Sequence, residues 1–280
     1  MPMPTADDEL DLLETQLLLE AIYRRYGFDF RDYAVASIRR RIQSVLEEEG
    51  LSSLAELQGK LLHNASCMER FLLKVTVHAT AMFRDPAFYR TFRESVVPLL
   101  AEMPFLRVWH VGCSTGEEVY SMAILLDEAG LASKCRIYAT DMNEAVLAEA
   151  KQGIFPLAKL QEYTQNYQQA GGTRAFSDYY SARYDRVLFD RHLTAMVVFS
   201  PHNLVTDSSF NEFHVVLCRN VMIYFNQSLS ARVHRLLFES LADGGFLCLG
   251  NRESIRFTPH AGSYCDFDDN ARIYRKKPEP

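Results

Sequence analysis

The residues best suited to chemistry form a turn with two glycines, Gly112-Cys113-Ser114-Thr115-Gly116-Glu117-Glu118. A β-branched apolar run precedes the turn and a helical apolar spacing follows it, so backbone N–H groups and a helix N-terminus face any ligand bound there. The glycines let that ligand approach the backbone closely. The turn matches neither the G-x-G-x-x-G fingerprint nor a P-loop, and it carries two carboxylates without a basic residue. This composition favours a ligand with a cationic part over a bare phosphate.

Two further segments place polar side chains at predicted strand ends. Asp141 ends an apolar run over 136–141, and an acidic side chain at that place can accept both hydroxyls of a ribose. A second buried run leads into Cys218-Arg219-Asn220-Val221-Met222-Ile223-Tyr224-Phe225. Ligands of open α/β sheets bind outside the carboxyl ends of the strands. The three ends together therefore predict a site for a nucleoside cofactor.

Each of these residues also has a purely structural interpretation. Glu117 and Glu118 both fit capping boxes, Asp141 fits a helix cap, and Tyr224 fits the core. Because all of them lie at predicted strand ends, we favour the ligand site. The sequence contains no H-E-x-x-H motif, Cys/His cluster or nucleophile elbow, so we expect neither a metal site nor covalent serine chemistry.

From residue 107 onward, strand-like and helical patterns alternate, which is typical of a parallel sheet covered by helices. We predict strands over 108–111, 136–141, 213–220 and 246–249, and helices over 116–126, 143–151 and 228–242. Asp243-Gly244-Gly245 is expected to end the last of these helices. A final strand over 272–275 has no crossover helix before it, so we place it antiparallel at the sheet edge. The predicted fold class is α/β with a doubly wound sheet.

The alternation stops between about 161 and 191. Residues 179–190 alternate aromatic or apolar with polar side chains, which predicts a hairpin or small antiparallel β insert within about 165–195. A docking surface and a minor core both fit its aromatic density, and we favour a minor core because small sheets need aromatic side chains to cohere. The aromatic residues are Phe176, Tyr179, Tyr180, Tyr184 and Phe189.

Residues 1–76 have helical patterns only and predict a small all-helical N-terminal domain of four helices, followed by a second domain over 77–280. One apolar stripe comprises Leu10, Leu13, Leu17 and Ala21, and another comprises Ile38, Ile42, Val45 and Leu46. Ser53 with Glu56, and Ser66 with Glu69, match the capping box at a helix start.

This helical domain holds the chain's concentration of basic residues, namely Arg24, Arg25, Arg31, Arg39, Arg40 and Arg41. On the second helix, Arg39, Arg40 and Arg41 lie largely off the apolar stripe, so we expect them to face solvent or an acidic partner surface. The formal net charge of −6 argues against a dedicated nucleic-acid binder.

Composition narrows the class of protein. The 48% apolar and 24% charged content is that of an ordinary globular protein, and no apolar run approaches the roughly 18 residues of a membrane helix. The N-terminus has no signal-peptide pattern, and none of the six cysteines forms a C-x-x-C pair. We therefore expect a reduced cytoplasmic protein with buried thiols.

The segment over 76–86 joins the two domains. Asp85 before Pro86 predicts the start of a helix, and Pro98 is expected to kink or end that helix. His78, Thr80 and Arg84 lie between the two domains, and interdomain clefts are common ligand sites.

These motifs resemble the CheR family of chemotaxis-receptor methyltransferases, which use S-adenosylmethionine. The resemblance rests on Cys113-Ser114-Thr115-Gly116-Glu117-Glu118-Val119-Tyr120-Ser121 and on the run from Cys218 to Phe225. Supporting matches are Thr80-Ala81-Met82-Phe83-Arg84-Asp85, Ala139-Thr140-Asp141-Met142-Asn143 and Asn203-Leu204. The resemblance implies a Rossmann-like methyltransferase sheet with an inserted β-subdomain, after an all-helical N-terminal domain.

Carried over by position, the resemblance implies a set of cofactor contacts and no metal. Asp141 would face the ribose, Glu118 the cationic amino-acid end, Asn203-Leu204 the adenine, and Arg219-Asn220 the sulfonium and methionine part. The full implied set is His78, Thr80, Arg84, Gly112, Glu118, Asp141, Asn203, Leu204, Arg219 and Asn220. Two residues depart from the family pattern: His78 stands where Asn is usual, and Val119 where Pro is usual.

The implied reaction is methyl transfer to glutamate side chains in the cytoplasmic helical domain of chemoreceptors. A glutamate with a pKa of about 4.3 is already ionised at neutral pH, so catalysis needs alignment and exclusion of water rather than a base. We predict that Arg84 and Tyr224 orient the substrate carboxylate and that Arg39, Arg40 and Arg41 bind the receptor. We expect a monomer that binds no nucleic acid and does not insert into membranes. A small-molecule methyltransferase and a non-catalytic module that binds S-adenosylmethionine or S-adenosylhomocysteine are the alternatives.

Overall fold

The computed structural model of the chain describes residues 6–76, 80–256 and 258–278. Two compact units are present, one formed by Met1–His78 with Tyr224–Arg232 and the other by Ala79–Ile223 with Val233–Pro280. Within the described residues, every helix is too short or too polar to span a membrane.

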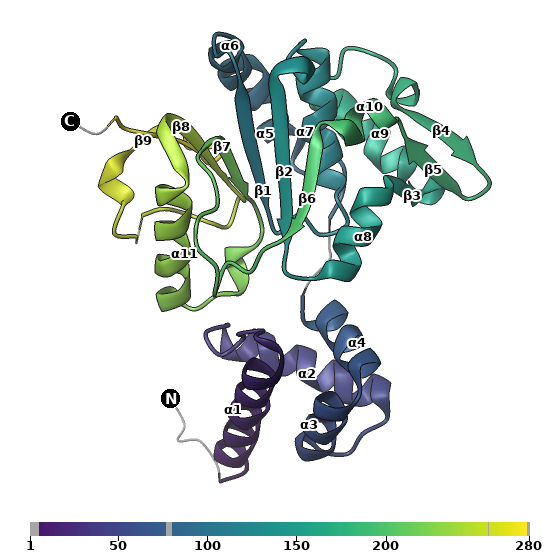
Figure 1. Ribbon diagram of the computed structural model, residues 1–280, viewed down its shortest axis with the longest axis vertical. Helices are drawn as coiled ribbons and strands as arrows, with labels where there is room; N and C mark the ends of the chain where they lie inside the picture. Colours follow the sequence, from purple (N-terminus) through teal and green to yellow (C-terminus); the bar gives the residue numbers. More distant parts are fainter. Residues whose placement is uncertain (1–5, 77–79, 257, 279–280) are drawn as a thin grey trace. The chain divides into compact units, whose positions relative to one another are not determined.

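The first unit contains the predicted helices α1 (Ala6–Tyr26), α2 (Val35–Glu49), α3 (Leu54–His63) and α4 (Ala65–Val75), as Figure 1 shows. α1 packs on α3, and α2 packs on α4. The predicted cap at Ser53 is confirmed, because its hydroxyl accepts the N–H of Glu56 at 3.2 Å, while the Glu56 carboxylate accepts the N–H of the preceding Ser52 at 2.8 Å. The one at Ser66 is wrong, since Asn64 caps α4 by accepting the N–H of Cys67 at 3.0 Å.

The buried face of α1 also differs from the prediction. Leu10, Leu13 and Leu17 are 56%, 52% and 54% exposed. Leu18, Leu19 and Ile22 are buried instead. α1 is rich in leucine on more than one side, so two stripes have helical spacing and spacing alone does not determine which one packs inward.

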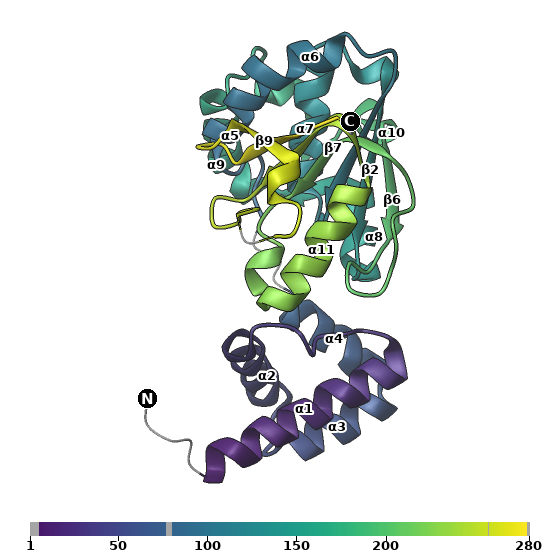
Figure 2. The same ribbon diagram turned by 90° about the vertical axis from the view of Figure 1, so that its left-hand side faces the viewer.

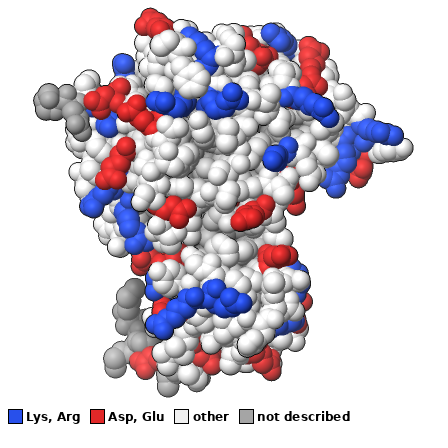
Figure 3. All heavy atoms as spheres, in the orientation of Figure 1, with Lys and Arg blue, Asp and Glu red and all other residues white. Residues whose placement is uncertain are grey.

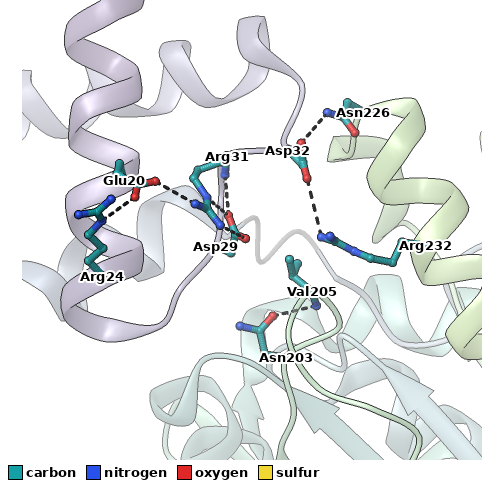
Figure 4. A network of polar contacts seen from close by, with 9 residues as sticks. All are labelled: Glu20, Arg24, Asp29, Arg31, Asp32, Asn203, Val205, Asn226 and Arg232. Carbon is teal, nitrogen blue, oxygen red and sulfur yellow. Dashed lines mark hydrogen bonds and ion pairs between the residues drawn. The ribbon is translucent and has the colours of Figure 1, made fainter.

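The segment Tyr224–Arg232 joins the first unit although it is distant in sequence. The N–H of Ala34 donates to the carbonyl of Tyr224 at 2.9 Å, and the N–H of Asn226 donates to the carbonyl of Asp32 at 2.9 Å. The carboxylate of Asp32 also accepts a hydrogen bond from the side chain of Asn226 and lies 3.8 Å from the guanidinium of Arg232, as Figure 4 shows. These contacts hold the start of α11 (Gln227–Glu239) to the loop between α1 and α2.

The second unit is built on a sheet with the strand order β6-β2-β1-β7-β8-β10-β9 (Figure 1). β6, β2, β1, β7 and β8 are parallel, whereas β10 and β9 are antiparallel. The strands are β1 (Leu106–Val111), β2 (Cys135–Asp141), β6 (Val197–Pro201), β7 (Phe213–Cys218), β8 (Leu241–Leu249), β9 (Tyr264–Asp268) and β10 (Ile273–Lys276). The predicted α/β class with a doubly wound sheet is confirmed.

Helices and short turns connect and cover these strands. Figure 2 shows α5 and α9 side by side, and Arg90 of α5 donates to the carbonyl of Gln169 at 3.0 Å. The helices are α5 (Pro86–Thr91), α6 (Val97–Ala101), α7 (Glu117–Glu128), α8 (Glu144–Gln152), α9 (Leu160–Gln169) and α10 (Arg191–Ala195). The shorter turns are η1 (Phe92–Val96), η2 (Ala132–Lys134), η3 (Leu157–Lys159), η4 (Phe176–Tyr179), η5 (Met222–Tyr224) and η6 (Ala261–Ser263).

Three details of the sheet differ from the prediction. β6 and β9 were not predicted, and β9 rather than β10 lies at the edge. β10 is antiparallel as expected. α11 ends at Glu239, and β8 continues through Gly244-Gly245, so these glycines do not end the helix.

The helix that starts at Pro86 changes its hydrogen-bonding type before it reaches Pro98. η1 is a π-helical turn inserted between α5 and α6, and Pro98 lies in the first turn of α6. Proline has no N–H to donate and its ring displaces the carbonyl four residues earlier, so the wider π turn lets the helix continue. The predicted kink is thus a local change of helix type.

The predicted hairpin is present as β4 (Tyr180–Arg183) and β5 (Arg186–Phe189). A third strand, β3 (Ile154–Pro156), pairs with β5 and lies before the predicted insert. Phe176, Tyr179 and Phe189 are buried, which confirms a minor core, but Tyr184 is 85% exposed at the hairpin turn.

Candidate functional site

The sheet order places four chain turns at neighbouring strand ends of the second unit. The turn after β1 lies between those after β2 and β7, and the turn after β6 follows that of β2. Asp141, at the end of β2, is in register with Pro201 at the end of β6. Gly112, Asp141 and Arg219 therefore follow or end three neighbouring strands at one edge of the sheet, as predicted.

The turn after β1 is tied to the end of β2 by its backbone. The N–H of Cys113 donates to the carbonyl of Thr140 at 2.9 Å, and the N–H of Ser114 donates to Oδ2 of Asp141 at 2.9 Å. Gly112 has φ +62°, and a Cβ there would lie 2.7 Å from Cγ2 of Val221. Only glycine fits both the backbone angle and this contact.

The carboxylate of Asp141 is buried and oriented by two backbone donors. Its Oδ1 accepts the N–H of Asn143 at 3.0 Å, while Oδ2 accepts that of Ser114. The N-cap of α8 is Asn143, so the helix-cap interpretation of Asp141 is wrong. These two hydrogen bonds fix the orientation of the Asp141 carboxylate at the end of β2.

Neither Glu117 nor Glu118 caps α7. The helix N-cap is Gly116, in a left-handed conformation without a side-chain bond. Glu117 is buried and accepts hydrogen bonds from Thr115 at 2.6 Å and Tyr163 at 3.3 Å. Glu118 instead forms an ion pair with Arg219. The capping-box interpretation is therefore wrong for both glutamates.

The guanidinium of Arg219 is fully buried between carboxylates and an aromatic ring. It pairs with Glu118 and, at 2.8 Å, with Asp85, and its central carbon lies 4.1 Å from the centre of the Phe88 ring. Burial opposes its charge, but Glu118 and the other nearby acidic groups raise the pKa of Arg219 above its usual value. One cation against two carboxylates leaves one net negative charge in this cluster.

The loop that carries Arg84 has an unusual backbone. Phe83 and Asp85, on either side of Arg84, have φ +50° and +59°. The N–H of Phe83 donates to Oγ of Ser121 at 2.8 Å, and the carbonyl of Arg84 accepts a bond from Arg219 at 3.3 Å. Non-glycine residues at positive φ cost free energy and cluster at functional sites, where surrounding contacts stabilise them. Asp85 was predicted as a helix cap, yet its side chain makes no cap bond and binds Arg219.

Buried polar atoms without a hydrogen-bond partner occur at the same edge of the described sheet. They include Oδ1 of Asn220 after β7, Nδ2 of Asn143 after β2 and Nε2 of His110 in β1. Burial, and secondarily the charge of Arg219, lowers the pKa of His110 to about 3, so this imidazole is neutral. Unpaired buried donors and acceptors are costly, so their grouping fits a polar ligand that supplies partners.

The remaining predicted cofactor residues have less distinctive surroundings. Asn203 follows β6 and shapes a turn, with its Oδ1 accepting the N–H of Val205 at 3.0 Å, as Figure 4 shows. Leu204 lies in the same turn, and Thr80 precedes the loop of Arg84. His78 lies outside the described residues.

The predicted receptor-binding arginines do not form one exposed face. Arg39 pairs with Asp11, and Arg40 is exposed. Arg41 is buried: its Nη1 donates to the carbonyl of Val75 at 2.9 Å and its guanidinium covers the ring of Tyr224. Figure 3 nevertheless shows a band of Lys and Arg side chains on the surface of the helical unit. The expectation that Arg41 faces solvent or a partner surface is wrong.

Glu253 was not predicted at all. Its buried carboxylate accepts hydrogen bonds from the backbone of the turn that follows β7. No spacing or motif distinguishes this glutamate in the sequence, because its partners are backbone groups contributed by a distant segment.

The sheet just described is that of the Rossmann-like methyltransferases. The chain belongs to the CheR methyltransferase family. The family model described as "CheR methyltransferase, SAM binding domain" matches residues 78–268, and the one described as "CheR methyltransferase, all-alpha domain" matches residues 13–76. The predicted resemblance is thereby confirmed.

Named relatives span nearly the whole chain. It is 46% identical to "Putative methyltransferase Cher3" of Pseudomonas putida, over 94% of this chain and 97% of that protein. It is 28% identical to "Chemotaxis protein methyltransferase" of Listeria innocua, over 88% and 92% of the two chains. The protein of the same name from Salmonella typhimurium is 29% identical over 85% of this chain and 82% of its own.

Proposed function

We propose that this protein transfers the methyl group of S-adenosylmethionine to glutamate side chains in the cytoplasmic helical domain of chemoreceptors. Support comes from relatives named chemotaxis protein methyltransferase. The observation that carries the cofactor assignment is the acidic edge of the sheet. Asp141 ends β2 on one side of β1, and a cluster with one net negative charge follows β7 on the other side. Such an edge suits a nucleoside with a cationic centre.

Each residue of the edge has a proposed role toward the cofactor. Asp141 accepts the ribose hydroxyls, while Asn203 and Leu204 flank the adenine. Glu118 faces the cationic amino-acid end, and because its carboxylate also neutralises Arg219, that arginine does not repel a sulfonium. Asn220 supplies an otherwise unpaired acceptor. Gly112 lets the ligand approach the backbone, and Thr80, Arg84 and His78 complete the set.

The chemistry makes modest demands on the protein. Bound S-adenosylmethionine supplies an activated methyl group on a good leaving group. A carboxylate oxygen forms the new O–CH3 bond, the S–CH3 bond breaks, and its electron pair remains on the now neutral sulfur. No proton moves, so no general base is required. Arg84 and Tyr224 align the carboxylate, and Arg84 must hold it loosely because a strong ground-state ion pair would favour substrate over the transition state.

Arg39 and Arg40 remain the proposed receptor contacts on α2. A hollow of about 240 Å³ lies beside them in the helical unit, lined by both arginines together with Asp11, Thr15, Ile42, Gln43 and Leu54. Its basic and polar lining suits an acidic receptor helix. We propose that the protein acts as a cytoplasmic monomer.

The test is incubation of the full chain with methyl-radiolabelled S-adenosylmethionine and a panel of receptor cytoplasmic domains. We expect label on receptor that base releases as methanol, the signature of a carboxyl methyl ester. Receptors whose glutamates are replaced by alanine serve as controls. Transfer to small molecules alone would indicate a small-molecule methyltransferase. Binding of S-adenosylhomocysteine without transfer to any receptor would indicate a non-catalytic module.

A further inference from the structure

The carboxylate of Glu253 closes the turn that follows β7. Oε2 accepts the N–H of Gly250 at 2.7 Å and that of Asn220 at 2.8 Å. Oε1 accepts the N–H of Val221 at 2.9 Å and that of Met222 at 2.7 Å. One side chain thus satisfies three consecutive backbone donors of the turn and ties them to the end of β8.

This carboxylate is buried without a basic partner among the described ion pairs. Burial raises the pKa of Glu253, while its four backbone hydrogen bonds act in the opposite direction. A buried carboxylate is costly unless hydrogen bonds compensate for lost water. An uncharged side chain at this position would avoid the cost of burying a charge. We therefore infer that the carboxylate serves to stabilise the turn.

The turn needs such stabilisation because its geometry is strained and crowded. Asn220 has φ +62°, a left-handed conformation that few residue types other than glycine and asparagine adopt routinely. Val221 is so close to Gly112 that a Cβ on that glycine would lie 2.7 Å from Cγ2 of Val221. A Cβ on Gly250 would lie 2.8 Å from the N atom of Asn220 and 2.8 Å from Oε2 of Glu253. Glu253 therefore fixes a turn that touches the β1 loop directly.

We propose that Glu253 is a positioning residue for cofactor binding. Its carboxylate holds Asn220 in the left-handed conformation and presses Val221 against Gly112, so that the turns after β1 and β7 keep the shape of the ligand site. This inference rests on the proposed function, in which Asn220 and Gly112 contact S-adenosylmethionine. It adds a residue that does not itself touch the cofactor.

The experiment is calorimetric titration of the full chain with S-adenosylhomocysteine, alongside thermal unfolding. In Glu253→Gln, one oxygen becomes an N–H2 group that faces backbone donors, so we expect affinity to fall at least tenfold. Glu253→Asp keeps the charge but has shorter reach, and should restore part of the affinity. In Gly250→Ala the new Cβ would lie 2.8 Å from both the Glu253 carboxylate and the N atom of Asn220, so it should disturb their hydrogen bond and lower the affinity as well.

Glu128→Gln is the matched control. Glu128 is also a buried carboxylate with several donors. The hydroxyls of Tyr167 and Tyr179 and the N–H of Thr173 come from the insert, and Arg93 of η1 pairs with it at 2.6 Å, so its partners lie outside the turn after β7. It should lower Tm without lowering the affinity for S-adenosylhomocysteine. Unchanged affinity in folded Glu253→Gln, or equal affinity losses in Glu253→Gln and Glu128→Gln, would overturn the inference. If Glu253→Gln does not fold, the affinity of Gly250→Ala for S-adenosylhomocysteine tests the inference instead, and an unchanged affinity would overturn it. A wild-type chain that binds no S-adenosylhomocysteine would refute the proposed function itself.

Discussion

The guanidinium of Arg41 lies 4.3 Å from the centre of the Tyr224 ring, within the first unit. Arg41 comes from α2 and Tyr224 from the distant segment that joins this unit. Burial lowers the pKa of Arg41, and none of the described ion pairs neutralises it. A buried arginine that stacks on the proposed catalytic tyrosine is better suited to fixing that ring than to recruiting a partner.

Replacing Arg41 should therefore affect turnover. Arg41→Met keeps the bulk of the side chain but loses a cation–π contact of about 0.5–2 kcal/mol and the bond to Val75. Because misplacement by about 1 Å can reduce rate 100-fold, we expect kcat to fall at least tenfold in the receptor assay. Arg40→Met, on the exposed side of the same helix, should raise KM for the receptor and leave kcat nearly unchanged. Equal effects of the two variants on KM alone would contradict this division of roles.

Tyr224→Phe and Arg84→Ala test the proposed alignment of the substrate carboxylate. Both residues are proposed to act on the receptor glutamate, so turnover should fall about 10- to 100-fold in each variant. The affinity for S-adenosylhomocysteine should change less than about threefold in Tyr224→Phe, and far less than turnover in Arg84→Ala, whose side chain is also a proposed cofactor contact. Steady-state kinetics and calorimetry on the same preparations provide both numbers. Wild-type turnover in either variant would remove that residue from the catalytic assignment.

Arg219 should be among the most sensitive residues of the second unit. Arg219→Met leaves Glu118 and Asp85 without their buried cation, and breaking such a pair costs about 3–5 kcal/mol. Both carboxylates are partly exposed, so we expect a loss near 3 kcal/mol in urea unfolding followed by the fluorescence of Trp109, the single tryptophan of the chain. Arg256→Met removes an exposed pair with Asp269 and should cost under about 0.5 kcal/mol. Similar losses of unfolding free energy in both variants would show that the buried cluster contributes no more to stability than an exposed ion pair.

Much of the large unit could be predicted because its signals are local. The strands near 108, 136 and 213 are buried apolar runs, and turns that carry polar residues follow them. β6 was missed because it is only partly buried along most of its length and ends at Pro201, so it lacks the continuous apolar pattern of a central strand. α9 was missed because its apolar residues are few, although Leu160, Tyr163 and Tyr167 have helical spacing and are buried.

The errors in the site come from pairings that depend on tertiary structure. Arg41 follows Ile38 by three residues and therefore shares its buried face, a signal that the sequence offered. No such signal exists for Glu118, because its spacing fits a capping box whether or not its carboxylate pairs with Arg219 in the turn after β7. Asp85 likewise stands at a typical N-cap position, but its carboxylate binds Arg219 instead of the helix backbone.

The stability of the chain should fall in mild acid because of two buried histidines. Burial lowers the pKa of His110 to about 3 and that of His234 to about 4, below the ordinary value of 6.5. A lowered pKa in the folded state means that unfolding takes up protons. This stability is therefore complete above pH 6.5 and is lost as pH falls toward 4 for His234 and toward 3 for His110. At pH 5 each histidine should cost about 2 kcal/mol relative to pH 7.5.

Urea unfolding at pH 7.5 and pH 5.0 measures this loss. His110→Gln and His234→Gln should each reduce the difference between the two pH values by about 2 kcal/mol. His192→Gln is the control, because that side chain is half exposed. A pH dependence that is the same in all variants would mean that other groups cause the acid sensitivity.

Gly112 offers a test of the close approach between the turns after β1 and β7. Gly112→Ala introduces a Cβ at φ +62° and 2.7 Å from Cγ2 of Val221, whereas Gly130→Ala introduces one at φ +72° with nothing within 4 Å. Both variants carry the same backbone strain of about 1–2 kcal/mol, so any further loss in Gly112→Ala reports the contact with Val221. We expect affinity for S-adenosylhomocysteine to fall at least tenfold in Gly112→Ala and to stay unchanged in Gly130→Ala. Adding Val221→Ala removes the clashing methyl and should recover part of the affinity, whereas no recovery in the double variant would place the defect in the backbone of the β1 turn alone.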